Sequence, residues 1–161
     1  MAGSNLDTCA LRVAFLAYTN LYPEGLVAGE GRPGVSDARL ENVLERIAEA
    51  RGRADVVVVS YHWGDEYQTT SNSSQQKIAR SLIDAGTDLV IGHHSHVVQE
   101  VEKYKDGWIA YSLGNFVFDQ DFSEETMRGL MLRVIAEKGR VSRVEEVPIR
   151  ISETFQPYVV E

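Results

Sequence analysis

The 161-residue sequence contains a single cysteine, Cys9, so it can form no internal disulfide and no zinc motif built on several cysteines. It has no apolar run of the ~20 residues that a membrane-spanning helix needs. Its first residues do not combine a basic segment with an apolar core, so they do not resemble a secretory signal. The chain as written is therefore predicted to remain in the cytoplasm.

Positive charge is also scarce. The 16 Lys and Arg residues against 24 Asp and Glu residues give a formal net charge of −8, which argues against binding to nucleic acid or to an anionic membrane surface. An acidic protein that handles an anionic substrate needs a local source of positive charge, and a bound metal ion can supply it. Length and composition fit one domain over residues 1–161, with loose ends at 1–10 and 156–161.

Apolar runs and helical periodicity alternate in the first half of the chain. Short runs rich in strand-forming residues predict strands at 11–18, 55–61 and 88–91, and the Gly- and Pro-rich segment 19–35 predicts a long loop. Apolar stripes at helical spacing predict helices that begin at Ser36 and at Ser73 or Ser74, capped by these serines. This order predicts parallel strands with crossover helices, whose functional groups gather at the carboxyl ends of the strands.

The second half of the sequence predicts antiparallel hairpins. Residues 97–104 and 108–113 flank the turn Asp106-Gly107, a strand resumes at 116–118, and a further pair spans 129–136 and 141–151. Pro148 places the last of these strands at a sheet edge, because proline cannot donate to a ladder. The predicted fold class is therefore α/β, with parallel strands and crossover helices followed by antiparallel hairpins.

Three of the four histidines, His93, His94 and His96, directly follow the predicted strand 88–91, and the fourth, His62, follows the strand 55–61. Because the carboxyl ends of parallel strands meet at one edge of a sheet, we expect His62, His94 and His96 to converge. Neutral imidazole is a common ligand of transition metals and a poor one for magnesium or calcium. The sequence therefore predicts a site for one or two divalent ions of zinc, manganese or iron.

Other polar residues near these strand ends are candidates for accessory roles. Asp65 and Glu66 could bind the metal directly or orient a histidine. His93 should point away from His94 by strand alternation and is a candidate proton donor or phosphate contact. Asn115 could bind substrate or hold a β-bulge. The inert alternative is that all of these are hydrogen-bonded polar residues at strand ends without chemistry.

Three segments carry a more specific signal: they span residues 60–67, 83–99 and 111–120. In this order and spacing they resemble the bacterial capsule-synthesis CapA family, also called poly-γ-glutamate synthesis proteins, within the calcineurin-like metallophosphoesterase superfamily. The resemblance covers about residues 11–151. It implies part of a metallophosphoesterase-like α/β/β/α sandwich with a two-metal site, in which His62 and His94 would bind one metal and His96 the other. Ser95 stands where the family usually has proline, and both ligand positions flanking it are kept.

The resemblance further implies a phosphoesterase-type hydrolase that acts on an anionic phosphoester or polymer precursor in capsule or poly-γ-glutamate synthesis, often at the cell envelope. It is a resemblance to the C-terminal half of the family, because the early Gly-Asp, acidic and Asn-His motifs have no counterpart here. Without the bridging carboxylate, three histidines would suit one zinc-like ion better than a dinuclear centre.

The missing half would leave sheet edges and apolar faces uncovered. We therefore expect the chain to associate with itself or to depend on a separately encoded N-terminal half. Two functions remain as hypotheses. The chain is a metal-dependent hydrolase or its C-terminal part, or it is a non-catalytic half-domain that serves assembly or polymer binding at the cell envelope.

Overall fold

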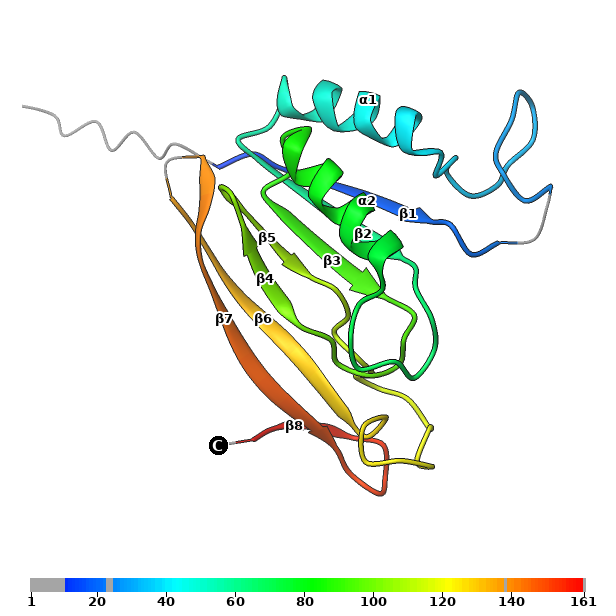
Figure 1. Ribbon diagram of the computed structural model, residues 1–161, viewed down its shortest axis with the longest axis vertical. Coiled ribbons are helices and arrows are strands. Elements are labelled where there is room, and N and C mark those ends of the chain that lie inside the picture. The colour runs from blue at the N-terminus through cyan, green and yellow to red at the C-terminus, as the bar shows by residue number, and fades with distance from the viewer. Residues whose placement is uncertain (1–10, 23–24, 138, 161) are drawn as a thin grey trace, which may run out of the picture.

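The computed structural model describes residues 11–22, 25–137 and 139–160 (Figure 1). Its elements in chain order are β1 (Val13–Thr19), α1 (Leu40–Arg51), β2 (Val56–His62), α2 (Ser73–Asp84), β3 (Leu89–His93), β4 (Val101–Tyr104), β5 (Gly107–Ala110), β6 (Arg128–Glu137), β7 (Arg140–Ile151) and β8 (Pro157–Val159). The segment 1–10, predicted to be loose, lies outside the described residues.

The first sheet has five strands in the order β1-β2-β3-β5-β4. β1, β2, β3 and β5 run parallel, and β4 pairs antiparallel with β5. α1 and α2 connect successive parallel strands and lie together on one face of this sheet (Figure 1). The predicted parallel half with crossover helices is therefore confirmed.

β2 supplies apolar side chains to both faces of this sheet, because successive side chains of a strand point in opposite directions. Val57, Val59 and Tyr61 pack against the helices. The helix residues buried in the same cluster are Val43 and Ile47 of α1, and Ala79, Leu82 and Ile83 of α2. Val56 and Val58 point to the opposite face. This two-sided burial explains the unbroken valine run in the sequence.

β6, β7 and β8 form a second, antiparallel sheet in the order β6-β7-β8. It packs on the face of the first sheet that the helices leave free, where Leu132 and Val144 meet Leu89 and Trp108. The layers are thus helices, mixed sheet and antiparallel sheet, as expected for part of an α/β/β/α sandwich. β6 and β7 run alongside β4 and β5, whereas β1 forms the opposite edge of the first sheet (Figure 1).

Both helix caps differ from the sequence prediction. Ser36 does not open α1, which begins at Leu40 after Arg39 and has no side-chain cap. The reason is that the Asp37 carboxylate accepts hydrogen bonds from the backbone N–H and the guanidinium of Arg39, and this local turn competes with a helical first turn. α2 is capped by Asn72, in a reciprocal capping box with Gln75, instead of by Ser73 or Ser74.

Several strand predictions are also corrected. Residues 116–118 form no strand, and the strand predicted at 97–104 begins only at Val101. Pro148 lies on β7, the middle strand of the second sheet, because β8 adds a further strand beyond it. The same strand overturns the prediction that the chain is loose from residue 156, since Pro157 to Val159 pair with β7.

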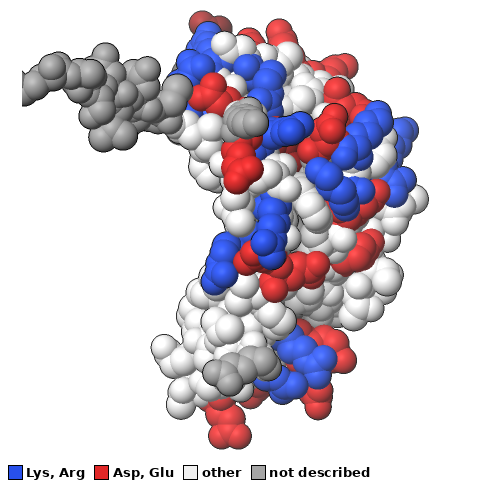
Figure 2. Space-filling model, turned by 90° about the vertical axis from the view of Figure 1, so that its left-hand side faces the viewer, with Lys and Arg blue, Asp and Glu red and all other residues white. Residues whose placement is uncertain are grey.

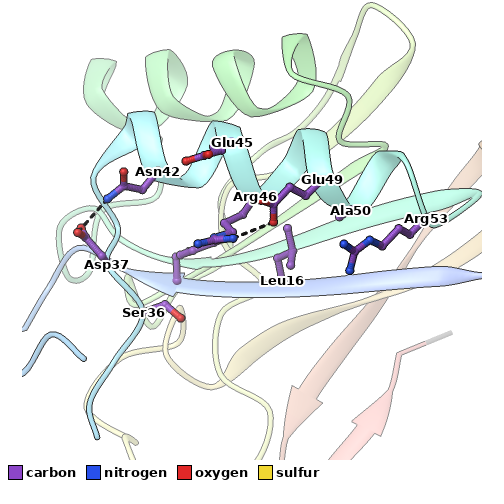
Figure 3. A pocket seen from close by; sticks show the side chains of 10 residues that line it. Leu16, Ser36, Asp37, Asn42, Glu45, Arg46, Glu49, Ala50 and Arg53 are labelled. Atoms are coloured by element: carbon purple, nitrogen blue, oxygen red, sulfur yellow. Dashed lines mark hydrogen bonds and ion pairs between the residues drawn. The ribbon is translucent and has the colours of Figure 1, made fainter. Parts of the chain in front are cut away.

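A cleft of about 590 Å³ lies between β1 and α1. Its walls carry two polar pairs, Asp37 with Asn42 and Arg46 with Glu49, and Leu16 of β1 forms part of its floor (Figure 3). No histidine lines this cleft. Figure 2 shows Lys and Arg side chains intermixed with Asp and Glu, with no wide region of one sign on that face. Within the described part of the chain, no helix is long and apolar enough to cross a membrane.

Candidate metal centre

The candidate site lies where β2 and β3 end. The two strands are parallel neighbours, and their register sets His62 beside His93. The backbone N–H of Trp63 still donates to the carbonyl of His93, at 3.1 Å, after which the chain turns sharply. His94 has φ 105° and His96 has φ 59°, both in the left-handed region. A residue with a side chain held there costs about 1–3 kcal/mol, and such strain clusters at functional sites.

The turn gathers potential ligand atoms from two segments. Glu66, which follows β2, and His94 and His96, which follow β3, each offer one ligand atom, and these atoms all lie within 4.8 Å of one another. The ring of His62 lies edge-on to that of His94, with centroids 4.7 Å apart. The centroids of His94 and His96 are 6.1 Å apart. The structure therefore brings His94 and His96 together with Glu66, which the sequence offered as a possible direct ligand. The ring of His62 contacts that of His94, but among the described residues His62 lies outside this group of converging ligand atoms.

His62 is held by a residue that the sequence analysis did not single out. Thr19, the last residue of β1, places its hydroxyl oxygen 3.0 Å from Nδ1 of His62. The same hydroxyl donates to the carbonyl of Leu21 and accepts from the backbone N–H of Leu21. Its second lone pair can accept from Nδ1–H of His62, and in that tautomer Nε2 carries no proton. Burial lowers the pKa of His62, and the neighbouring His94 and His96 lower it further. Neutral imidazole, the form that binds metals, is thereby favoured.

His96 is enclosed by the loop that follows β5. Its Nδ1 lies 3.0 Å from the amide oxygen of Asn115, a residue that is 6% exposed. Its ring also contacts two aromatic rings, with centroid distances of 6.0 Å to Tyr67 and 5.2 Å to Phe118. Asn115 thus contacts a candidate ligand. Its predicted role in binding substrate remains a prediction.

The remaining predicted residues lie near the cluster in different ways. The Asp65 carboxylate accepts a hydrogen bond of 2.7 Å from the side chain of Asn72, the cap of α2, and is absent from the group of converging ligand atoms among the described residues. His93 is partly buried beside His62. Burial lowers the pKa of His93, as does its neighbour His62.

The donor set fits a divalent transition ion. Two imidazoles and one carboxylate, with a further imidazole alongside, are ligands that zinc, iron and manganese sites use. The sequence rule that strand ends converge could also have found Thr19, because β1 neighbours β2. No sequence signal pointed to the ring contacts of Tyr67 and Phe118, which depend on how two loops pack.

Comparison with known proteins gives one family. The family described as "Bacterial capsule synthesis protein PGA_cap" matches residues 5–120. The chain is 40% identical over 141 residues to the "PGA biosynthesis protein CapA" of Bacillus subtilis, covering 88% of this chain and 37% of that protein. It is 37% identical over 147 residues to the "Capsule biosynthesis protein CapA" of Bacillus anthracis, covering 89% of this chain and 36% of that protein. The chain thus spans little more than a third of these relatives, which is consistent with the predicted resemblance to a C-terminal half.

Proposed function

The chain belongs to the bacterial capsule synthesis protein PGA_cap family, and on that basis we propose that it carries the metal site of a hydrolase in capsule or poly-γ-glutamate synthesis. The observation that carries the proposal is the convergence of ligand atoms from Glu66, His94 and His96 within 4.8 Å. The names of the Bacillus relatives support the biosynthetic role, and the histidine cluster supports the chemistry.

Zinc, manganese or iron would be held by Glu66, His94 and His96, with His62 as a neighbouring donor for the same ion or for a second one. Imidazole ligation disfavours magnesium and calcium, which prefer oxygen ligands. When bound, such an ion supplies Lewis acidity toward a phosphoryl or acyl oxygen, and positive charge in a chain whose net charge is −8.

The substrate we propose is an anionic phosphoester or polymer precursor. The chain's own groups would bind and orient it. His93 lies beside His62 at the end of β3, and its burial favours the neutral ring, which still donates one N–H hydrogen bond. We therefore assign His93 to contact with a substrate oxygen. Asp65 is committed to Asn72 and would act only by shaping the start of α2.

Metal content tests the proposal directly. The purified chain is expected to retain a divalent transition ion, and Glu66→Gln and His94→Ala are each expected to weaken binding by at least about tenfold. Asp65→Asn is the matched control, because it changes the adjacent carboxylate, which is bonded to Asn72. Metal analysis of the desalted proteins and calorimetric titration provide the readout. Equal metal binding in all four proteins would contradict the proposal.

Turnover of a chromogenic phosphate ester tests the hydrolase part. Activity should require added zinc, manganese or iron, disappear in His94→Ala and persist in Asp65→Asn. Metal binding without any turnover would retain the site and reject autonomous catalysis by this chain.

A second candidate function is favoured by the exposure of β1. Phe15 points to the same face of the first sheet as Val58, but the apolar cluster beneath the second sheet includes no described residue of β1, and Phe15 is 74% exposed. The relatives are also much longer than this chain. The chain would then be a non-catalytic half-domain for assembly or polymer binding, and β1 would dock the remaining part of a family-length protein. Co-purification with the separately expressed N-terminal part of such a relative should succeed for the natural chain and fail for Phe15→Asp. Association of the chain with itself alone would reject this choice of partner.

A further inference from the structure

Asn115 makes three polar contacts from a buried position in the loop that follows β5. Its amide nitrogen donates to the backbone carbonyl of Thr126 at 3.0 Å and to the side-chain oxygen of Gln120 at 3.2 Å. Its amide oxygen lies 3.0 Å from Nδ1 of His96. The side-chain hydrogen-bonding capacity of Asn115 is therefore directed to its own loop on one side and to a candidate metal ligand on the other.

These contacts determine which His96 nitrogen carries the proton. A backbone carbonyl can only accept hydrogen bonds, so the amide nitrogen of Asn115 must face Thr126. The amide oxygen must then face His96, and an oxygen acceptor requires a proton on Nδ1 of the imidazole. Nδ1–H donates to Asn115, and Nε2 of His96 keeps its lone pair.

The direction of the His96 ring is restricted as well. Tyr67 lies on one side at a centroid distance of 6.0 Å, nearly parallel at 27°, and Phe118 lies at 5.2 Å. The same loop also positions Tyr67, because Gln120 donates to the Tyr67 hydroxyl at 3.2 Å and the Phe122 ring lies edge-on to it at 5.1 Å. Rotation of the imidazole would break the Asn115 bond and disturb these ring contacts.

We propose that Asn115 is a positioning residue for His96: it holds the imidazole in the Nδ1–H tautomer and directs Nε2 toward the metal cluster. This inference rests on the proposed metal site and adds to it a residue that acts on the site through His96. A metal-binding histidine commonly donates its second ring N–H to a carbonyl or carboxylate, and loss of that acceptor typically weakens metal binding 10–100-fold. Asn115 is the acceptor of this kind for His96.

Two substitutions at this position separate positioning from a structural role. Asn115→Leu removes both the acceptor for His96 and the donor to Thr126. Asn115→Asp keeps an acceptor oxygen for Nδ1–H and loses the donor to Thr126. Under the proposal, Asn115→Leu binds Zn²⁺ about 10–100-fold more weakly than the natural protein, whereas Asn115→Asp stays within a few-fold of it. If Asn115 only stabilises the loop, both variants weaken Zn²⁺ binding alike, and that result overturns the proposal.

The tautomer is measured without metal. Long-range ¹H–¹⁵N correlation spectra of the ¹⁵N-labelled metal-free chain, at mildly alkaline pH where imidazoles are neutral, report the protonated nitrogen of His96. We expect Nδ1–H in the natural protein and in Gln120→Leu, which removes an Asn115 contact but not the bond to His96. A predominantly Nε2–H ring in the natural protein overturns the inference. Absence of Zn²⁺ binding by the natural chain would instead refute the proposed function, and the spectra would still decide the tautomer.

Discussion

β1 and β2 are neighbouring strands with similar apolar sequences, yet the same face of each meets different surroundings. Val13 and Phe15 pair in register with Val56 and Val58, so the four side chains point to one face of the sheet. Val56 and Val58 are 2% and 5% exposed, whereas Val13 and Phe15 are 43% and 74% exposed. The apolar cluster beneath the second sheet includes Val56 and Val58 and, among the described residues, none from β1.

The comparison shows that apolar composition identifies a strand but not whether another layer covers it. On the helix side, too, β1 is incompletely covered, because the cleft of about 590 Å³ opens between β1 and α1 (Figure 3). β1 is also an edge strand, with β2 on one side only in the described sheet. One exposed apolar face, one open edge and a helix side that is only partly covered are features that the attachment surface proposed for β1 would need.

The largest expected effect comes from placing the same charge at two register-paired positions. Val56→Asp buries an unpaired carboxylate beneath the second sheet, which costs several kcal/mol, a large part of the ~5–15 kcal/mol that stabilises a domain. Val13→Asp places it on the open face and should change the free energy of unfolding by about 0.5 kcal/mol or less. Urea unfolding followed by circular dichroism measures both.

If Val13→Asp lost as much free energy of unfolding as Val56→Asp, the contrast between β1 and β2 would be wrong, because β1 would then be covered in solution. Repeating the unfolding at several protein concentrations identifies a second copy as the cover, because the midpoint then rises with concentration.

The next contrast is between two ion pairs on α1. Asp88, just before β3, accepts from the backbone N–H of Val57 at 2.8 Å and pairs with Arg51 at the end of α1. Asp88→Asn weakens both contacts of a largely buried carboxylate and should cost about 1–3 kcal/mol. Glu49→Gln breaks the exposed pair with Arg46 in the β1 cleft and should cost about 0–0.5 kcal/mol. Thermal unfolding of both variants tests the ranking, and equal losses would refute it.

Much of the fold follows from the sequence because it depends on local rules. The valine run predicted β2 as a central strand, and the strand–helix alternation predicted the parallel order of the first sheet. The position of Pro148 on a middle strand was not predictable, because it depends on β8 docking against β7. Exposure of β1 could not be predicted either, since coverage depends on where the second sheet lies and not on the residues of β1.

Part of the candidate site also follows from sequence order, and the rest depends on how the loops pack. The rule that strand ends converge gathers His62, His94 and His96 from sequence order alone. It could not choose between Asp65 and Glu66, because the choice depends on Asn72, the cap of α2, which binds Asp65. The contact between Asn115 and His96 joins residues 19 positions apart, on either side of the β4–β5 hairpin, and no periodicity encodes it.

High pH should lower the stability of the core through its buried tyrosines, Tyr61 and Tyr111. Burial raises the pKa of Tyr111 above its usual value, and its hydrogen bond of 2.7 Å to Glu102 raises it further. Burial also raises the pKa of Tyr61, to about 12. A group whose pKa is raised by folding contributes stability that is fully present below its unfolded pKa and is lost as pH rises through its folded pKa.

The free energy of unfolding should therefore fall as pH rises above about 10, the unfolded pKa of tyrosine. Tyr111→Phe should make this fall shallower, and Tyr158→Phe, in the exposed strand β8, serves as the control. Urea midpoints across that pH range measure the slope. Identical slopes in Tyr111→Phe and the natural protein would show that this tyrosine does not govern the alkaline loss.

The smallest expected effect concerns the attachment of β1 itself. Asp55, just before β2, accepts from the backbone N–H of Arg12 at 2.9 Å and pairs with its guanidinium at 3.1 Å. The side-chain hydrogen bond from Arg12 lowers the pKa of Asp55 below its usual value. A carboxyl whose pKa is lowered by folding contributes stability above its unfolded pKa of about 3.9, and this is lost as pH falls through its folded pKa.

Asp55→Asn should remove this acid dependence, and because the pair is exposed the change should be confined to β1. Amide hydrogen exchange, corrected for intrinsic rates, measures this change. As pH falls, the β1 amides should lose protection more steeply in the natural protein than in Asp55→Asn. The protection of the β2 and β3 amides should be the same in both proteins. Loss of protection in β2 and β3 as well would mean that β1 unfolds together with the covered strands. β1 would then unfold as part of the core. In that case β1 and β2 would differ in exposure but not in stability.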